Sequence, residues 1–157
     1  MGPLYHLLNE QDRIKAVLKS LKLLKRNGKI FVSFINMFAN MIFAMKTAPL
    51  LVMSSVQSEI EYINAFIENK SFAGDAFTQA FFISQNEVLP FMAQFPLEKL
   101  HLFGQEGITS PCEQNIMSQP KEVVDTWMDL CEKVCEREDL LSYSEHLMYI
   151  GRKQNEH

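Results

Sequence analysis

Glycine is scarce and scattered in this chain of 157 residues. Nucleotide-binding turns in α/β proteins need closely spaced glycines between a strand and a helix, so that the backbone can approach the phosphates. Only Gly104 and Gly107 lie near each other, and no third glycine joins them. The sequence therefore contains no glycine-rich turn of this kind. The six glycines are Gly2, Gly28, Gly74, Gly104, Gly107 and Gly151.

Cysteine is also rare, with Cys112, Cys131 and Cys135 as the whole set. A small odd number of cysteines is typical of reduced thiols and indicates a cytoplasmic protein. Cys131 and Cys135 would share one helix face, which suits either a metal or redox pair or two small core residues. No histidine or further cysteine completes a ligand set, so the core interpretation is favoured and no metal site is predicted.

Long uncharged runs and basic blocks are both absent. The most apolar stretch, residues 30–53, is interrupted by Asn36, Asn40, Lys46 and Pro49. A membrane helix needs about 18 or more nearly uncharged apolar residues, so we expect no membrane span. The formal net charge of -4 argues against a nucleic-acid-binding protein, whose affinity depends on neutralising phosphates. No basic region followed by an apolar one, as in a signal peptide, is visible.

The residues that are present predict one globular α/β domain, with 47% hydrophobic and 22% charged residues. Residues 10–26 have helical apolar spacing, with Asn9 as the N-cap and Gly28 as the left-handed residue after the helix. The run KIFVSFIN (29–36) is apolar nearly throughout, which is typical of a strand covered on both faces. Further helices are expected at 37–48, 55–67, 84–95 and 120–137, a loop at NKSFAGD (69–75), a short strand or arm at 76–84, and strands within LEKLHLFGQEG (97–107) and EHLMYIGRK (145–153).

Three segments resemble class I S-adenosylmethionine-dependent methyltransferases that act on small molecules. GPLYHLLNEQDR, with the helix, turn and strand that follow it, is similar to the segment after the family's fourth strand. LEKLHLFGQEG resembles the sixth strand and its turn, and SEHLMYIGRK resembles the closing seventh strand. Residues 37–84 resemble the helical lid that some of these enzymes place over the substrate.

The resemblance implies that residues 1–157 form a single domain equivalent to the C-terminal part of that fold. The expected fold is a partial Rossmann-like sheet of the family's strands five, seven and six, with helices on both faces and a helical lid. The strands that bind the cofactor, one to four, would lie upstream of Met1. The chain alone is therefore expected to be inactive.

The resemblance also implies roles for residues around S-adenosylmethionine and a small-molecule methyl acceptor. Tyr5 and His6 would be catalytic, with His6 as a general base if it titrates near neutrality. The residues implied at the cofactor are Gly2, Pro3 and Leu4. The residues implied on the substrate side are Ser33, Asn36, Phe81, Gln105 and Glu106.

Most of these residues also have a structural interpretation. His6 could be a polar loop residue, and Asn36 could cap the next helix. Gln105 and Glu106 could lie in a solvated turn, and Phe81 could belong to the core. Two further histidines, His101 and His146, are expected to be structural. Methyl transfer in most of this family uses no metal.

The family's sheet places strand five beside strand four. Without strand four, the edge of residues 29–35 would be open, and an open apolar edge invites pairing. We therefore expect a homodimer through this edge, a separate N-terminal partner chain, or low stability. The alternative function is a non-enzymatic dimerisation or partner-binding module derived from the fold. A mostly helical ligand-binding protein is disfavoured by the three strand-like runs.

Overall fold

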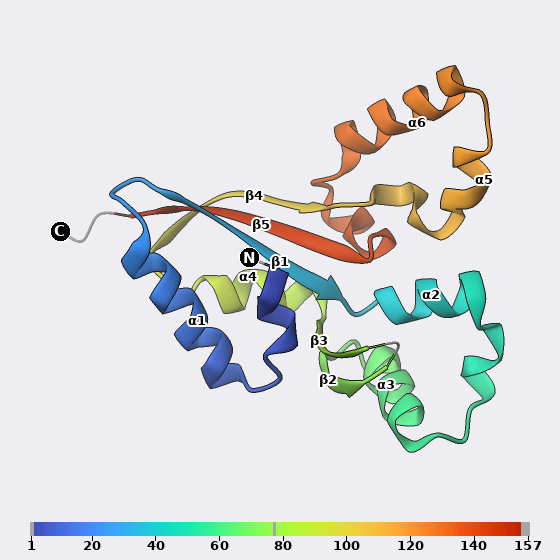
Figure 1. Cartoon of the computed structure of the whole chain (residues 1–157), viewed down its shortest axis with the longest axis horizontal. Helices are drawn as coiled ribbons and strands as arrows, with labels where there is room; N and C mark the ends of the chain where they lie inside the picture. Colours follow the sequence, from blue (N-terminus) through green and yellow to red (C-terminus); the bar gives the residue numbers. More distant parts are fainter. Residues whose placement is uncertain (1, 77, 155–157) are drawn as a thin grey trace.

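The computed structural model describes residues 2–76 and 78–154, and its centre is a five-stranded mixed sheet (Figure 1). The strands are β1 (Lys29–Asn36), β2 (Phe72–Asp75), β3 (Gln79–Ile83), β4 (Leu97–Gly104) and β5 (His146–Lys153). Their order across the sheet is β2-β3-β1-β5-β4. β1 is parallel to β3, whereas β5 is antiparallel to both of its neighbours, β1 and β4.

Helices connect the strands and lie around the sheet. They are η1 (Gly2–His6), α1 (Glu10–Leu23), α2 (Ala39–Thr47), η2 (Pro49–Met53), α3 (Gln57–Ile67), α4 (Gln85–Met92), η3 (Gly107–Cys112), α5 (Glu113–Met117), α6 (Lys121–Val134) and η4 (Glu138–Tyr143), where η marks a 3-10 helix. The predicted α/β class is confirmed. Across residues 2–76 and 78–154, no helix has both the length and the apolar character needed to cross a membrane.

Both ends of α1 are held by side chains. The Asn9 side chain accepts a hydrogen bond from the backbone N–H of Gln11, which confirms Asn9 as the N-cap. At the other end, Lys153 Nζ donates to the carbonyl oxygens of Leu21 and Leu24. The prediction for Gly28 was wrong, because the left-handed residue is Asn27, with a φ of 59°. Asparagine is one of the few non-glycine residues that tolerates this conformation.

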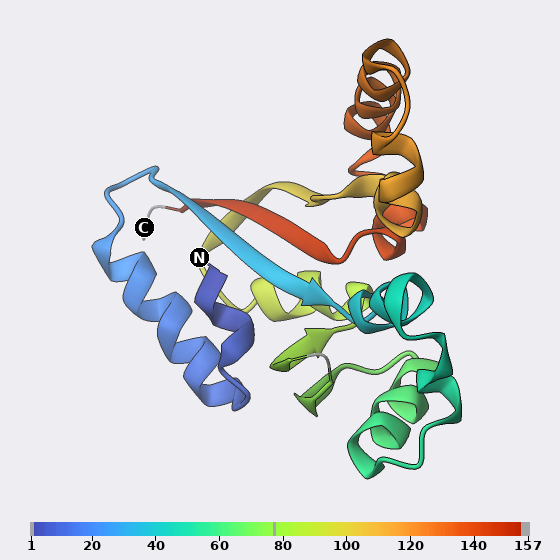
Figure 2. The ribbon, with the colours of Figure 1, turned by 45° about the vertical axis from the view of Figure 1, so that its right-hand side comes forward.

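The main core lies on one face of the sheet. Val32 and Phe34 of β1 and Leu147 and Tyr149 of β5 are buried there. Figure 2 shows α1, η1 and α4 on this side of the strands. Phe34 packs edge-on against Phe91 of α4, with 6.2 Å between the ring centroids. Burial of these side chains is the main source of stability for the sheet.

The opposite face of β1, β5 and β4 is only partly covered. Phe31 is 49% exposed and lies beside Ile150 in the register, with Met148 and Phe103 half-buried next to them. We call these four residues the open face. The prediction of a strand covered on both faces was wrong for the first half of β1, because α1 and α4 pack against the same side.

Residues 37–84 are helical only in part. After α2, η2 and α3, the chain forms the antiparallel β2–β3 hairpin, in which Phe72 pairs with Phe82. The loop prediction for residues 69–75 was therefore wrong at β2. β3 also pairs with β1 through Ile35 and Asn36, and η1 contacts β1 as well. The edge that was expected to be open is thus partly occupied by the chain itself.

Candidate functional site

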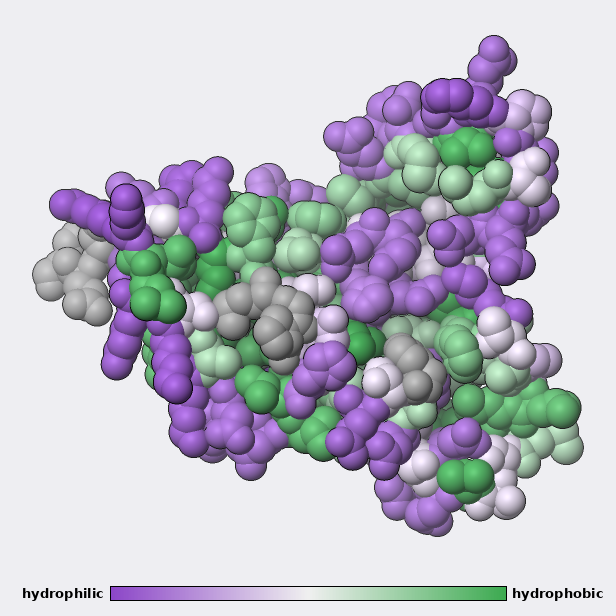
Figure 3. Space-filling view, viewed as in Figure 1, coloured by the Kyte–Doolittle hydropathy of each residue, from purple (hydrophilic) through white to green (hydrophobic). Residues whose placement is uncertain are grey.

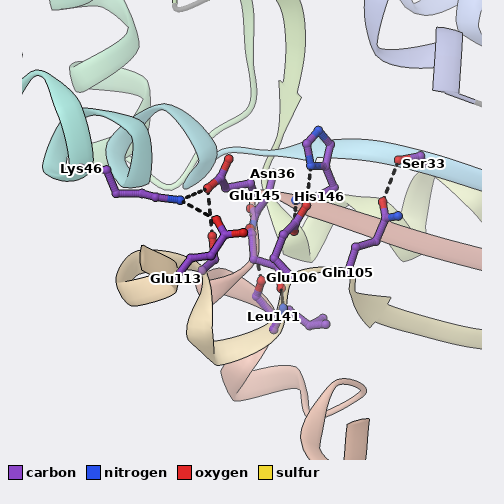
Figure 4. A network of polar contacts seen from close by, with 12 residues as sticks. Ser33, Asn36, Lys46, Gln105, Glu106, Glu113, Leu141, Glu145 and His146 are labelled. Atoms are coloured by element: carbon purple, nitrogen blue, oxygen red, sulfur yellow. Dashed lines mark hydrogen bonds and ion pairs between the residues drawn. The ribbon is translucent and has the colours of Figure 1, made fainter. Parts of the chain in front are cut away.

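The candidate site lies where several strands end together. β1, β3 and β4 point the same way, so their carboxyl ends share one edge of the sheet, and β5 begins at that edge. Ligands in open α/β sheets bind at the carboxyl ends of parallel strands. Figure 4 shows polar side chains from these strand ends and from the neighbouring helices gathered at this edge.

His146 and Glu106 form the central pair of this site. Glu106 Oε1 lies 2.7 Å from His146 Nδ1, and Glu106 Oε2 accepts the backbone N–H of His146 at 2.9 Å. A carboxylate can only accept, so Nδ1 carries the proton and the neutral ring has its acceptor at Nε2. In Figure 4 the second ring nitrogen points away from Glu106. His146 can therefore accept a proton from a group on that side.

The pair shifts both pKa values in favour of the charged forms. The hydrogen bond to Glu106 raises the pKa of His146 above its ordinary value, although partial burial acts in the opposite direction. Burial opposes ionisation of Glu106, but the hydrogen bonds from the His146 side chain and backbone outweigh it and lower its pKa. Both side chains are about one-third exposed, so the solvent screens part of this attraction.

Tyr5 lies beside His146, and His6 lies next to Tyr5. The Tyr5 ring centroid is 4.7 Å from that of His6 and 6.3 Å from that of His146. Leu4 is 1% exposed, and its side chain packs in the core. The surroundings of Gly2 and Pro3, where the cofactor was expected, fall outside the part of the structure that is described.

Ser33 and Gln105 join β1 to the turn after β4. Ser33 Oγ donates to Gln105 Oε1 at 3.0 Å, and the backbone N–H of Gln105 donates to the carbonyl of His146. Gln105 is exposed, whereas Ser33 is nearly buried. These two predicted substrate-side residues therefore do lie together, at the side of the His146–Glu106 pair.

Asn36 is fully buried, and its side chain connects β1 to the segment that precedes β5. Its Nδ2 donates to the carbonyl oxygens of Leu141 and Ser144, at 3.0 and 2.8 Å. The expected helix cap is not found, because α2 has Phe38 at its N-cap position. The side-chain amide of Asn36 is thus bonded within the protein. One of its partners, Ser144, directly precedes Glu145 and His146 in the sequence.

A second charged group borders the site. Lys46 of α2 forms ion pairs with Glu145 at 3.0 Å and with Glu113 of α5 at 3.4 Å. Glu145 also accepts a hydrogen bond from Ser110 Oγ. Figure 4 shows Lys46 approaching these carboxylates from its helix. This group joins α2 to the segment that carries η3 and α5.

Phe81 does not belong to this site. The guanidinium carbon of Arg13 lies 3.5 Å from the centroid of the Phe81 ring. Arg13 also donates to the backbone carbonyls of Leu7 and Leu8. Phe81 therefore packs with α1 and α4, on the core side of the sheet.

Sequence reasoning missed His146 as a site residue. A usable signal was present, because the resemblance implies that the strands within 97–107 and 145–153 are neighbours in the sheet. In an antiparallel pair, the start of one strand lies beside the end of the other, and the structure pairs Gly104 with Leu147. This register brings Glu106 and His146 together.

We expect the His146–Glu106 pair to stabilise the fold most in mildly acidic solution. Its contribution needs ionised Glu106 and protonated His146. The pKa of Glu106 is lowered in the folded protein. Its contribution to stability is therefore fully present above pH 4.5, the ordinary pKa, and is lost as the pH falls through the pKa of the folded state. The pKa of His146 is raised in the folded protein. Its contribution to stability is therefore fully present below pH 6.5, the ordinary pKa, and is lost as the pH rises through the pKa of the folded state.

NMR titration of the histidine ring signals would test this linkage. Glu106→Gln should lower the pKa of His146 towards its ordinary value. The matched control is Glu136→Gln. Glu136 Oε1 lies 2.6 Å from Nδ1 of His101 on β4, so this variant removes the partner of a different histidine and should leave the pKa of His146 unchanged. An unchanged pKa of His146 in Glu106→Gln would show that the pair does not set it.

Comparison with models of known protein families gives no match to this chain, and no curated protein matches it either. Among residues 2–76 and 78–154, no group of three or more histidine, cysteine, aspartate or glutamate side chains is arranged to hold a metal ion.

Proposed function

We propose that this chain forms the acceptor side of an S-adenosylmethionine-dependent methyl-transfer site. The supporting observation is the arrangement β1-β5-β4, with β5 antiparallel between two strands that are parallel to each other. The resembled family arranges its strands five, seven and six in this way. In this chain the arrangement brings His146 to the same edge as Tyr5 and His6.

The residues at this edge suit the methyl end of such a cofactor. S-adenosylmethionine would supply an electrophilic methyl group on a positively charged sulfur. The half-buried Tyr5 ring can favour a nearby cation through its π face. His146 would take the proton that an amine or hydroxyl acceptor loses, while Glu106 holds the ring in position. His6 is a second candidate for this role, because its side chain is exposed beside Tyr5.

Titration of the isotope-labelled chain with S-adenosylmethionine, followed by NMR, tests the proposal. We expect localised, weak signal changes at Tyr5, His6 and His146, since the sequence holds no glycine-rich turn for the nucleotide end. His146→Ala should reduce the changes at Tyr5. His101→Ala, which removes the other histidine paired with a glutamate, should not.

Two outcomes would contradict the proposal. One is a spectrum that stays unchanged up to millimolar cofactor. The other is a set of changes confined to the opposite ends of the strands, such as residues 24–28 before β1. Tight binding measured by calorimetry would support the function but would overturn the expectation that the cofactor site is incomplete.

The alternative, a partner-binding module, is favoured by the apolar side chains that the chain exposes. Besides the open face, the surface of α2 and η2 carries exposed Met45, Leu50 and Met53 (Figure 3). Exposed apolar patches of this kind mark interaction surfaces. If this alternative holds, S-adenosylmethionine leaves every signal unchanged, so the same titration separates the two functions.

A further inference from the structure

The outward side of α6 combines exposed apolar side chains with acidic ones. Val123, Trp127 and Leu130 are each about two-fifths exposed. They line an open, shallow groove on the surface of α6, together with the acidic Glu122 and Asp129 and, at its end, the basic Lys133. Residues 122–132 contain four acidic and no basic residues. Within the described part of the chain, Asp125 pairs with Lys121, whereas Glu122, Asp129 and Glu132 form no ion pair. With four acidic and two basic residues, α6 keeps a net negative charge.

The outward side of α1 has the opposite charge. After the first turn, which carries Glu10 and Asp12, the rest of α1 and the residues that follow it up to 29 contain six basic and no acidic residues. Of the lysines among them, only Lys15 forms an ion pair with another described residue. Leu18 and Leu23 are exposed on the same helix, and Leu23 is 86% exposed. Charge of one sign beside exposed leucines is a surface suited to an acidic, partly apolar partner.

These two surfaces cannot meet within one molecule. Figure 1 shows α1 and α6 at opposite ends of the molecule, with the sheet between them. Both helices contain 14 residues, so their lengths match when they are laid side by side. From charge complementarity, exposed apolar side chains and equal length, we infer that α1 of one copy docks into the α6 groove of a second copy.

Such a contact is head-to-tail, because it joins two different surfaces. Each association leaves one α1 and one α6 unused, so further copies can add at both ends. The expected assembly is therefore an open chain whose mean size grows with protein concentration. None of the docking side chains takes part in the hydrogen bonds of the His146–Glu106 pair, so this association does not depend on the proposed methyl-transfer function.

Sedimentation velocity of the unmodified chain at two salt concentrations gives the first test. Raising sodium chloride from about 0.1 M to about 1 M shortens the Debye length from about 10 Å to about 3 Å. We expect the association constant to fall about tenfold or more between these conditions, as steering and pairing by charge are screened. A chain that stays monomeric up to millimolar concentration in low salt would overturn the inference.

Charge reversal gives a second test that does not rest on loss of association alone. Lys19→Glu with Lys22→Glu makes α1 acidic, and Glu122→Lys with Asp129→Lys makes the α6 groove basic. Each double variant should be monomeric by itself, because its two docking surfaces now repel. Mixing the two variants should restore association, since each then offers the charge that the other needs.

The mixing result decides the inference, provided that circular dichroism shows both variants to be folded. Restored association supports docking of α1 on α6. Association that persists in either variant alone, or a mixture that stays monomeric, overturns it. A closed dimer that neither reversal affects would assign self-association to another surface, such as the open face, and would also overturn it.

Discussion

Replacing Asn36 by alanine is expected to lower the free energy of unfolding by roughly 2–4 kcal/mol, because two buried hydrogen bonds are lost. The Asn36 side chain is fully buried, and it is the donor to the carbonyls of Leu141 and Ser144. Both carbonyls would then lie in the interior without this partner. Urea unfolding followed by circular dichroism measures the effect.

Asn36→Asp is a sharper variant, because it keeps the size and shape of the side chain. It replaces the donor by an oxygen that faces two carbonyl oxygens, so we expect at least the same loss of stability. Asn115→Ala on the exposed surface of α5 is the control and should change stability little. An Asn36→Asp protein as stable as the original would show that these two bonds do not matter.

Gly104→Ala is expected to cost about 3 kcal/mol of stability through overpacking. A Cβ atom at Gly104 would lie 2.8 Å from Ser144 Cβ and still closer to its hydroxyl oxygen. Ser144 cannot move away easily, because it is fully buried and its Oγ accepts the N–H of Gly107 at 2.8 Å. The strain falls on the turn that carries Gln105 and Glu106, so the candidate site should be disturbed as well.

A double-mutant cycle identifies the cause. Ser144→Gly alone should destabilise by removing the acceptor of the Gly107 N–H. In the double variant Gly104→Ala/Ser144→Gly, the loss should be smaller than the sum of the two single losses, because the clash is relieved. Gly74→Ala, whose Cβ would meet only the Phe72 ring, is a milder comparison. Strict additivity would rule out steric conflict at Ser144.

Local sequence patterns predicted the elements that form the frame of the sheet. The runs at 29–36, 97–104 and 146–153 are β1, β4 and β5, and the helical spacing after Asn9 is α1. These segments have a strong period or composition of their own. β2 does not, since Phe72–Asp75 contains glycine and aspartate, and its strand form depends on pairing with β3.

The candidate site was predictable only in its outline. Tyr5, Ser33 and Gln105 lie near the expected edge, but the partner of each side chain depends on contacts between distant segments. Asn36 shows this most clearly, because its bonds reach residues more than a hundred positions away in the sequence. The exposure of Phe31 could not be predicted either, because the sequence of an apolar strand does not show which face of the sheet the helices cover.

The position of β5 decides when this protein can fold. β5 is the last strand of the described chain, yet it lies between β1 and β4, and Lys29 pairs with Arg152. During synthesis, β1 leaves the ribosome long before β5, and no strand joins β1 to β4 until residues 146–153 emerge. Pairing over such a separation closes a long loop and is slow. Until residues 146–153 have been synthesised, the apolar side chains of β1 and β4 that β5 covers stay open to other contacts.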